Sequence, residues 1–432
     1  MITAMIRRLP MLAFIAAGAI VCLGVTLGCR ARPDDDAAID PQLEQEIAKI
    51  KAVDNHAHPV RPTAAGEPAD MEFDALPVDN LEEQSLPIRQ RATSAIVTEA
   101  GARLFHGDKA AQVRTHGADH ATWMLDQMGT EVMLANRVAM GPGLPSPRFL
   151  WVPFADALMY PLDNTAASLS PDQKAFFPLE DKLLSRYYAE SGVAGKPPTL
   201  QDYLDKVVRA TLERHKHGGA LAEKFEMAYL RTLEIGNPSR GDADQVYATG
   251  TGDYKVLQDY IFRFIATECG RLGMAVHIHV AAGGGGYFHV AWANPLLLEP
   301  LLDDPTLRKT TFVMIHGGWP FTREITPLLT KPNAYVDYSE QTAFNAPHDT
   351  SEVLRGWLSY IPEKVLFATD AFPFAPELGW EESGLIAANA GREALGRALT
   401  GMMRDKEITR EQAVALARLV LRDNARKLYG LK

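Results

Sequence analysis

The chain has 432 residues, of which 47% are hydrophobic and 23% are charged, and its formal net charge is −10 at pH 7. This length has room for one large domain or two ordinary ones, and the composition is that of a globular protein. The negative charge argues against a nucleic-acid-binding protein, which ordinarily carries a basic patch or a basic isoelectric point. We therefore expect a globular protein with no nucleic-acid partner, although the charge does not identify its substrate.

The first 29 residues resemble an export signal. Arg7 and Arg8 precede the apolar run LPMLAFIAAGAIVCLGVTLGC, which ends at Cys29 and gives way to the polar RARPDDD. A basic start before an apolar core is typical of a secretory signal, and Cys29 after Gly28 resembles the lipidation site of a bacterial lipoprotein. The alternative is an uncleaved membrane anchor, since the run is long enough to span a bilayer. Both place the folded part outside the cytoplasm, in the bacterial cell envelope, and the first predicts a lipid anchor at Cys29 that faces the periplasm or the exterior.

Residues 30–44 are expected to form a solvated tether, and residues 45–432 a single domain. Removal of residues 1–28 leaves two cysteines, and a lipidated Cys29 leaves Cys269 without a partner. No disulfide framework is then available, so the hydrophobic core must hold the fold.

Eight short apolar segments, rich in β-branched residues, recur along the predicted domain. They lie at 50–56, 130–138, 149–155, 222–230, 274–281, 310–316, 334–338 and 364–369. Apolar runs of this length between helical patterns are typical of parallel strands that are buried on both faces. Eight such units favour an α/β fold of the closed (β/α)₈ TIM-barrel type over an open doubly wound sheet.

The spacing of the predicted strands is uneven. The interval from the 50s to residue 130 and the segment 157–200 are expected to be enlarged βα loops, which lie at the catalytic mouth of a barrel. Near the C-terminus, Thr409 and Gln412 have the spacing of a capping box, which predicts a helical segment from this point.

Histidine and aspartate recur where the predicted strands end. The first strand ends in His56 and His58, the fifth contains HIH, the sixth ends in His316 and the eighth leads to Asp370. Residues i and i+2 of a strand point to the same side, so His56 and His58 can bind one ion. A barrel gathers the carboxyl ends of its strands around one centre, so His279, His316 and Asp370 are expected to converge there. Three imidazoles and a carboxylate suit Zn²⁺ with one position left open for water.

Other histidines and glycines nearby have competing interpretations. His277 and His279 both belong to HIH, and His279 is favoured because the Gly-rich loop follows it directly, but a register shift of two would put His277 in its place. The GGGG at 283–286 lacks the lysine and the spacing of a P-loop, so we expect a flexible mouth loop. His215 and His217 are expected to be solvated near a helix end.

Taken in order, these motifs resemble the amidohydrolase superfamily. They are VDNHAHP, the His on the fifth strand, the His on the sixth and LFATDA on the eighth, with support from MIHGGWPFTREITPLLTKPNAYVDYSE and NARKLYGL. Within the superfamily, residues 45–432 are similar to the amidohydrolase-related (amidohydrolase 2) branch of metal-dependent TIM-barrel enzymes, which includes hydrolases and non-oxidative decarboxylases.

The resemblance implies roles for five of these residues. His56, His58, His279 and Asp370 would bind a divalent metal ion, for which Zn²⁺ is favoured. Asp370 would also move the proton, and His316 would polarise the scissile carbonyl or orient the substrate. These roles agree with general chemistry, because a bound divalent ion lowers the pKa of water and an adjacent carboxylate can transfer the proton.

The fourth predicted strand contains Lys224, where binuclear members of the superfamily carry a carboxylated lysine that bridges two ions. Glu223 and Glu226 are alternative carboxylates, and Lys224 and Glu226 would point to one side of the strand and Glu223 to the other. We expect one ion, with a second only if Lys224 is carboxylated. Lys224 and Arg231 are expected to contact an acidic substrate, and Trp319 is expected to be a further substrate contact.

The expected reaction is hydrolysis of a C–N (amide-type) or ester-like bond by metal-activated water. One alternative is non-oxidative decarboxylation of a small carboxylic acid on the same scaffold. An alternative of another class is a lipoprotein that captures a substrate without catalysis. The intact set of His56, His58, His279 and Asp370 argues against the last alternative, since a chain without catalysis would be free to lose one of them.

Overall fold

The computed structural model describes residues 38–63, 68–76, 86–375 and 377–432. The predicted signal segment 1–29, including Cys29, lies outside these residues, as does residue range 30–37 of the predicted tether. Within the described part of the chain, no helix is both long enough and apolar enough to cross a membrane.

The predicted tether is wrong at its C-terminal end, because helix α1 (Pro41–Lys49) begins inside it. The Asp40 side chain accepts hydrogen bonds from the backbone N–H groups of Gln42 and Leu43, which caps the helix. Leu43 is fully buried in the core. The folded domain therefore includes residues 41–44.

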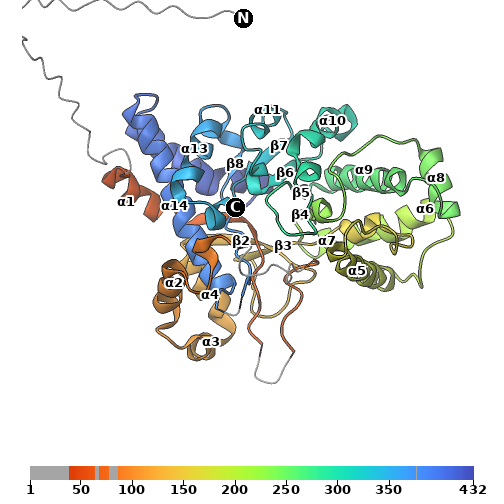
Figure 1. The fold of residues 1–432 in the computed structure, drawn as a ribbon, viewed down its shortest axis with the longest axis horizontal. Helices are drawn as coiled ribbons and strands as arrows, with labels where there is room; N and C mark the ends of the chain where they lie inside the picture. Colours follow the sequence, from red (N-terminus) through yellow and green to blue (C-terminus); the bar gives the residue numbers. More distant parts are fainter. Residues whose placement is uncertain (1–37, 64–67, 77–85, 376) are drawn as a thin grey trace, which may run out of the picture. The chain divides into compact units, whose positions relative to one another are not determined.

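Parallel strands form two sheets in chain order (Figure 1). The first sheet contains β1 (Ala52–Ala57), β2 (Thr130–Asn136) and β3 (Phe149–Val152), and the second contains β4 (Ala222–Phe225), β5 (Ala275–His279), β6 (Phe312–Ile315), β7 (Ala334–Asp337) and β8 (Val365–Leu366). Each strand overlaps one of the eight predicted segments, and every neighbouring pair is parallel. The predicted α/β fold with parallel strands is confirmed.

Backbone hydrogen bonds also join the edges of the two sheets. Between the residues after β3 and strand β4, the N–H of Lys224 donates to the carbonyl of Pro153 at 2.7 Å. Between the residues after β8 and strand β1, the N–H of Asp370 donates to the carbonyl of His56 at 2.8 Å. The second bond ties two predicted site residues together through their backbones.

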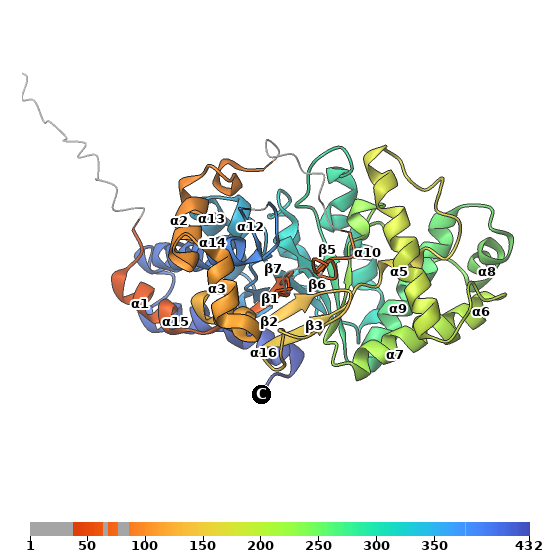
Figure 2. The same ribbon diagram turned by 90° about the horizontal axis from the view of Figure 1, so that it is seen from below.

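Helices connect the strands. Before β4 these are α2 (Ala95–Phe105), α3 (Lys109–His116), α4 (His120–Gln127), α5 (Phe177–Glu190), α6 (Leu200–Tyr203) and α7 (Ala210–His217). After β4 they are α8 (Arg240–Thr249), α9 (Tyr254–Leu272), α10 (Glu299–Asp303), α11 (Ile325–Leu328), α12 (Gln341–Phe344), α13 (Pro347–Leu358), α14 (Trp380–Arg404), α15 (Arg410–Arg418) and α16 (Asn424–Tyr429). In both ribbon views α2–α4 lie on one side of the strands and α5–α9 on the other (Figures 1 and 2). The two intervals predicted to be enlarged loops therefore contain helices of their own.

The C-terminal helical segment follows its sequence signals. The Thr409 hydroxyl accepts from the N–H of Gln412, and the Gln412 side chain accepts from the N–H of Thr409, so the predicted capping box is confirmed at the start of α15. Cys269 is buried and free.

The prediction that His215 is solvated is wrong. Its Nδ1 lies 3.0 Å from Oε1 of Glu223, and both side chains are buried. Burial of Glu223 requires a polar partner, and His215 supplies it. His217, two residues later, is exposed as predicted.

Candidate metal centre

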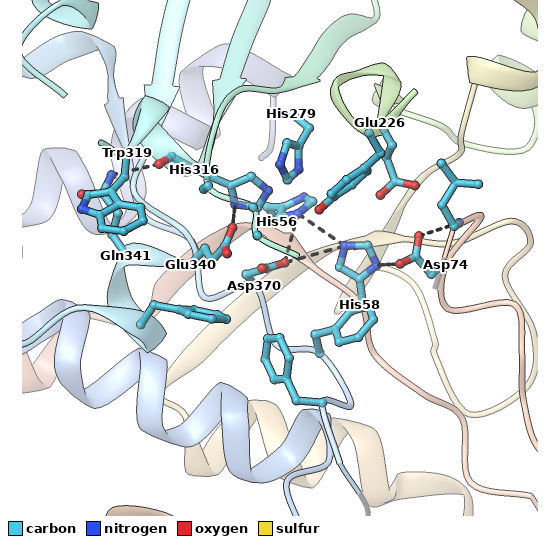
Figure 3. A pocket seen from close by; sticks show the side chains of 18 of the residues that line it. His56, His58, Asp74, Glu226, His279, His316, Trp319, Glu340, Gln341 and Asp370 are labelled. Carbon is cyan, nitrogen blue, oxygen red and sulfur yellow. Dashed lines mark hydrogen bonds and ion pairs between the residues drawn. The ribbon is translucent and has the colours of Figure 1, made fainter. Parts of the chain in front are cut away.

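A cavity of about 340 Å³ lies at the carboxyl ends of several strands. Its lining includes seven of the eight residues predicted for the site: His56, His58, Lys224, His279, His316, Trp319 and Asp370. His56 is in β1 and His279 ends β5, whereas His316 and Asp370 follow β6 and β8. Parallel strands bring these positions to one edge although they are far apart in the chain (Figure 3).

Three atoms of the cavity fit the ligand spacing of one metal ion. The Nε2 atoms of His56 and His58 are 3.4 Å apart, and Oδ1 of Asp370 lies 3.1 Å from the first and 3.7 Å from the second. Nitrogen ligands about 2.1 Å from a tetrahedral zinc ion would be about 3.4 Å from each other. These three side chains therefore form a candidate metal-binding group.

The first two rings are held so that Nε2 faces the cavity. Nδ1–H of His58 donates to the carbonyl of Phe73 at 2.9 Å, and the Asn136 side-chain amide lies 2.7 Å from Nδ1 of His56. The first contact leaves the lone pair of His58 on Nε2, and the second orients the ring of His56. Burial lowers the pKa of His58 to about 4 and that of His56 well below its usual value. Both rings are therefore neutral near pH 7, which is the form that binds a metal.

A second candidate group contains His279, His316 and Glu340, with one potential ligand atom of each within 4.8 Å of the others. Nε2 of His279 is buried and has no hydrogen-bond partner among the described residues. The Ser339 hydroxyl donates to Asp337 at 2.6 Å, so its oxygen accepts from Nδ1–H of His316 at 2.9 Å. Nε2 of a neutral His316 then carries a lone pair and cannot donate a hydrogen bond to a carbonyl. His279, predicted to bind alongside His56 and His58, lines the same cavity as they do and also groups with His316 and Glu340.

The structure distinguishes the two histidines of HIH. His279 lines the cavity, whereas His277 does not. Nε2 of His277 lies 2.7 Å from the Tyr429 hydroxyl, which in turn donates to Oδ1 of Asn55. His277 is therefore part of the interior network beneath the cavity.

Lys224 is buried in the cavity wall. Its Nζ lies 3.4 Å from Oε1 of Glu226, on the same side of the chain, and Glu223 points the other way as predicted. Burial raises the pKa of Asp74 to about 8 and that of Glu226 to about 7, although the positive charge of Lys224 lowers both. Burial also raises the pKa of Asp370 to about 7. The cavity therefore contains carboxyl groups that can exchange a proton near neutral pH.

Backbone strain gathers at the same place. His316, Glu340 and Asp370 line the cavity with φ values of 71°, 59° and 53°. A left-handed conformation costs a residue with a Cβ atom roughly 1–3 kcal/mol and persists only where the surroundings enforce it. Such clustering is typical of functional sites.

Sequence reasoning missed the carboxylates that support the site. The Thr369 hydroxyl and N–H donate to Asp54 at 2.6 and 3.0 Å, which holds the chain just before Asp370. Asp337 accepts from the N–H of His316 at 2.9 Å and from the Asn55 amide at 2.8 Å. The available signal was an aspartate within a segment predicted to be a buried strand, since a buried carboxylate needs hydrogen-bond donors.

The structure does not bring Arg231 to this cavity, so its predicted contact with a substrate there is not supported. The predicted fourth strand ran to residue 230, but β4 ends at Phe225 and the 3-10 turn η7 (Met227–Tyr229) redirects the chain. Arg231 lines a second cavity, and its Nη2 donates to Oδ1 of Asp259 at 2.5 Å.

The sequence family of the chain follows from comparison with known proteins. The family model described as amidohydrolase matches residues 209–431, which is more than half of the chain and includes β4–β8. The chain belongs to the amidohydrolase family. The predicted resemblance is therefore confirmed, and the two groups of side chains are candidate metal sites of an amidohydrolase.

Solved structures similar to this amidohydrolase share its fold. A Lactobacillus casei ATCC 334 protein assigned as a metal-dependent hydrolase has a TM-score of 0.64 and 16% identity, covering 91% of this chain and 98% of its own. Glucuronate isomerase from Caulobacter crescentus has a TM-score of 0.56 and 13% identity, and the match covers 93% of this chain and 97% of the isomerase chain. Because both hydrolase and isomerase occur among these neighbours, the fold does not select the reaction.

A curated relative of this amidohydrolase is Protein fluG from Emericella nidulans. The two are 30% identical over 184 residues, which is 41% of this chain and 20% of the relative. The match thus spans about a fifth of the length of that relative.

Proposed function

We propose that this amidohydrolase is a metal-dependent hydrolase that cleaves a C–N (amide-type) or ester-like bond of a small molecule. The observation that carries the proposal is the approach of three ligand atoms to within 3.1–3.7 Å of one another, from His56, His58 and Asp370. Membership of the amidohydrolase family supports it.

The residues of the cavity supply what hydrolysis requires. A divalent ion, for which we propose Zn²⁺ in one copy, polarises a carbonyl and lowers the pKa of water when bound. Asp370, with a pKa raised to about 7 by burial, can take a proton from the attacking water and return it to the leaving group. Lys224 places a positive charge in the wall, and Trp319, 43% exposed at the cavity, can contact the substrate.

We also propose that the two sheets form one closed (β/α)₈ TIM barrel. The strand order within each sheet and the backbone hydrogen bonds at both junctions, Lys224 to Pro153 and Asp370 to His56, support this arrangement. A closed barrel would leave no free sheet edge and would gather the eight strand ends around the metal centre.

Metal analysis tests the proposed centre. Purified protein is expected to contain about one equivalent of a divalent ion. His56→Ala is expected to lose this ion, because only His58 and Asp370 of the three ligands would remain. His217→Ala, a change at an exposed histidine of α7, is the matched control and should retain the ion. A well-folded protein that binds no divalent ion would contradict the proposal.

A substrate panel tests the reaction. Small amides and esters, scored for released amine or acid, should be cleaved by the native protein and not by His56→Ala. Carbon dioxide released from small carboxylic acids, with no hydrolysis, would instead identify a decarboxylase on the same scaffold.

We further propose that the protein is exported and held at the membrane by a lipid on Cys29. The supporting observation is the basic start and apolar run that end at this residue. Cys29→Ser should release the protein from the membrane fraction. Unchanged fractionation would favour a transmembrane anchor.

A further inference from the structure

The cavity at the metal centre combines a polar end with an apolar wall. The ionisable side chains of the polar end are nearly sealed, since Asp370, Asp74 and Glu226 are 8%, 6% and 3% exposed. This end therefore offers its polar atoms over a small area next to the candidate metal ligands. The part of a substrate that extends beyond this area lies against the other lining residues.

Three phenylalanines form an aromatic wall of the cavity. They are Phe344 of α12 and Phe372 and Phe374 of the segment after β8. The ring centre of Phe374 lies 5.6 Å from that of Phe344 and 5.1 Å from that of Phe372. Phe344 and Phe374 are partly exposed, so their adjoining rings offer an apolar surface to the contents of the cavity.

The aromatic wall adjoins the candidate metal ligands. The ring centre of Phe372 lies 5.3 Å from that of His58, and Phe372 follows Asp370 by two positions. Nε2 of His58 and Oδ1 of Asp370 are themselves 3.7 Å apart (Figure 3). A substrate whose scissile bond lies at these ligands therefore brings its neighbouring atoms onto the aromatic wall.

The chemistry of the aromatic wall limits what can bind against it. Phenylalanine side chains have no hydrogen-bonding atom, and the side chains of Leu76 and Pro87, which line the same cavity, have none either. A sugar or another polyhydroxylated group would lose hydrogen bonds to water on this surface without replacing them, which costs free energy. An aromatic ring loses no such bonds and gains stacked or edge-to-face contacts with the phenylalanines.

We propose that the substrate of this amidohydrolase carries an aromatic ring next to the bond that is cleaved, and that the aromatic wall selects this ring. The inference rests on the proposed hydrolysis at the metal centre and adds the substrate class, aromatic amides or esters. The cavity volume of about 340 Å³ lies in the range that holds a small organic molecule, which suits one ring beside one amide or ester group.

Binding of hydroxamates to the zinc-loaded full-length protein tests this proposal without any reaction. The hydroxamate group binds a divalent metal ion through its oxygen atoms. Benzohydroxamate and N-phenylacetohydroxamate carry a phenyl ring on the one or the other side of this group, whereas acetohydroxamate carries no ring. In calorimetric titration, at least one of the phenyl compounds should bind about ten-fold more tightly than acetohydroxamate.

Phe374→Ala removes the middle ring of the aromatic wall and should abolish most of this preference. Acetohydroxamate should bind this variant as it binds the native protein, which shows that the metal centre is intact. Phe264→Ala is the matched control, since Phe264 is also partly buried but lies on α9 outside the cavity, and it should keep the full preference. Phe344→Ala should lower the preference as well, and it replaces Phe374→Ala if that variant does not fold.

Equal affinities for the phenyl compounds and acetohydroxamate would overturn the proposal, as would a preference that Phe374→Ala leaves unchanged. Absence of binding by all of these hydroxamates would also overturn it. Hydrolysis of small amides or esters with no preference for a phenyl ring would contradict this inference and support the proposed function. A preference for the phenyl compounds without any hydrolysis would contradict the proposed function alone.

Discussion

His56 and His58 owe their suitability as ligands to partners from elsewhere in the chain. The Phe73 carbonyl and the Asn136 amide hold the Nδ1 edges, so both Nε2 atoms face Asp370. The two Nε2 atoms are 3.4 Å apart, close enough to share a proton or to bind one cation between them. The two histidines and Asp370 are therefore arranged in a way that suits the binding of a positive ion.

Thr369 acts on this site through Asp54. Thr369→Val keeps the shape of the side chain but removes the buried hydroxyl that donates at 2.6 Å. The buried Asp54 carboxyl then loses the hydrogen bond that the Thr369 hydroxyl donates to it. The free energy of unfolding should therefore fall by about 1–3 kcal/mol. Urea denaturation measures this change, and metal content should fall with it, since Asp370 is the next residue.

Thr267→Val is the control, because Thr267 is exposed on α9 and its hydroxyl donates to the Arg263 carbonyl within the same helix. This change should alter the free energy of unfolding by no more than about 0.5 kcal/mol. Equal decreases in the free energy of unfolding for Thr369→Val and Thr267→Val would show that the hydrogen bond to Asp54 does not stabilise the protein.

At the scale of elements, Arg137 joins the segments that follow β1 and β2. Its guanidinium donates to the Pro59 carbonyl at 2.6 Å and to the Asp70 carboxylate at 2.9 Å, and the side chains of this ion pair are fully buried. The N–H of Arg61 also donates to Asp70, at 2.8 Å. The long connection between these strands is therefore held close to the carboxyl end of β1 by charge-assisted hydrogen bonds.

The Asp70 pair should make stability depend on acid pH. Burial raises the pKa of Asp70, but hydrogen bonds from Arg137 and Arg61 outweigh it and hold the pKa below its usual value. A lowered folded-state pKa stabilises the protein above about pH 4 and loses that contribution as the pH falls through the folded-state value. Asp70→Asn should therefore lower the free energy of unfolding at pH 7 by about 3 kcal/mol, because Arg137 loses its counter-charge.

Urea denaturation of the native protein and of Asp70→Asn between pH 7 and pH 2 measures this effect. The difference between their free energies of unfolding should shrink below about pH 4. Asp126→Asn is the control, since this carboxylate is 59% exposed in a surface pair with Arg148 and should contribute less than about 1 kcal/mol. A difference for Asp70→Asn that does not change with pH would contradict the assigned ion pair.

For the whole molecule, a bound metal ion should contribute to global stability. The ligands at the end of β1 and in the segment after β8 lie more than 300 positions apart in the chain, so unfolding must separate them. A ligand at 1,000 times its dissociation constant adds about 4 kcal/mol to the free energy of unfolding. Removal of the ion with a chelator should therefore lower the melting temperature of the native protein.

His56→Ala should show the lower melting temperature without chelator and little further change with it. A native protein whose melting temperature does not respond to chelator or to added Zn²⁺ would contradict a metal that bridges these strands.

Local sequence signals located the strands well and the turns poorly. Apolar runs predicted all eight strand positions, because strands buried on both faces need continuous apolar sequence. The same signal placed Arg231 on the extension of β4, where η7 in fact redirects the chain. Glu340 was missed because nothing next to it in the sequence shows that it approaches His316.

The sequence by itself determined the family, the strand order and the histidine and aspartate positions that meet at the strand ends. The family and the strand order follow from motifs and apolar runs that are local in the sequence. The site positions follow from alternation along each strand, which sets which side chains share a face. Only the tertiary structure decided that His279 groups with His316 and Glu340, and that Arg231 lines a separate cavity. Such outcomes depend on partners supplied by distant strands and loops, whose approach no local pattern encodes.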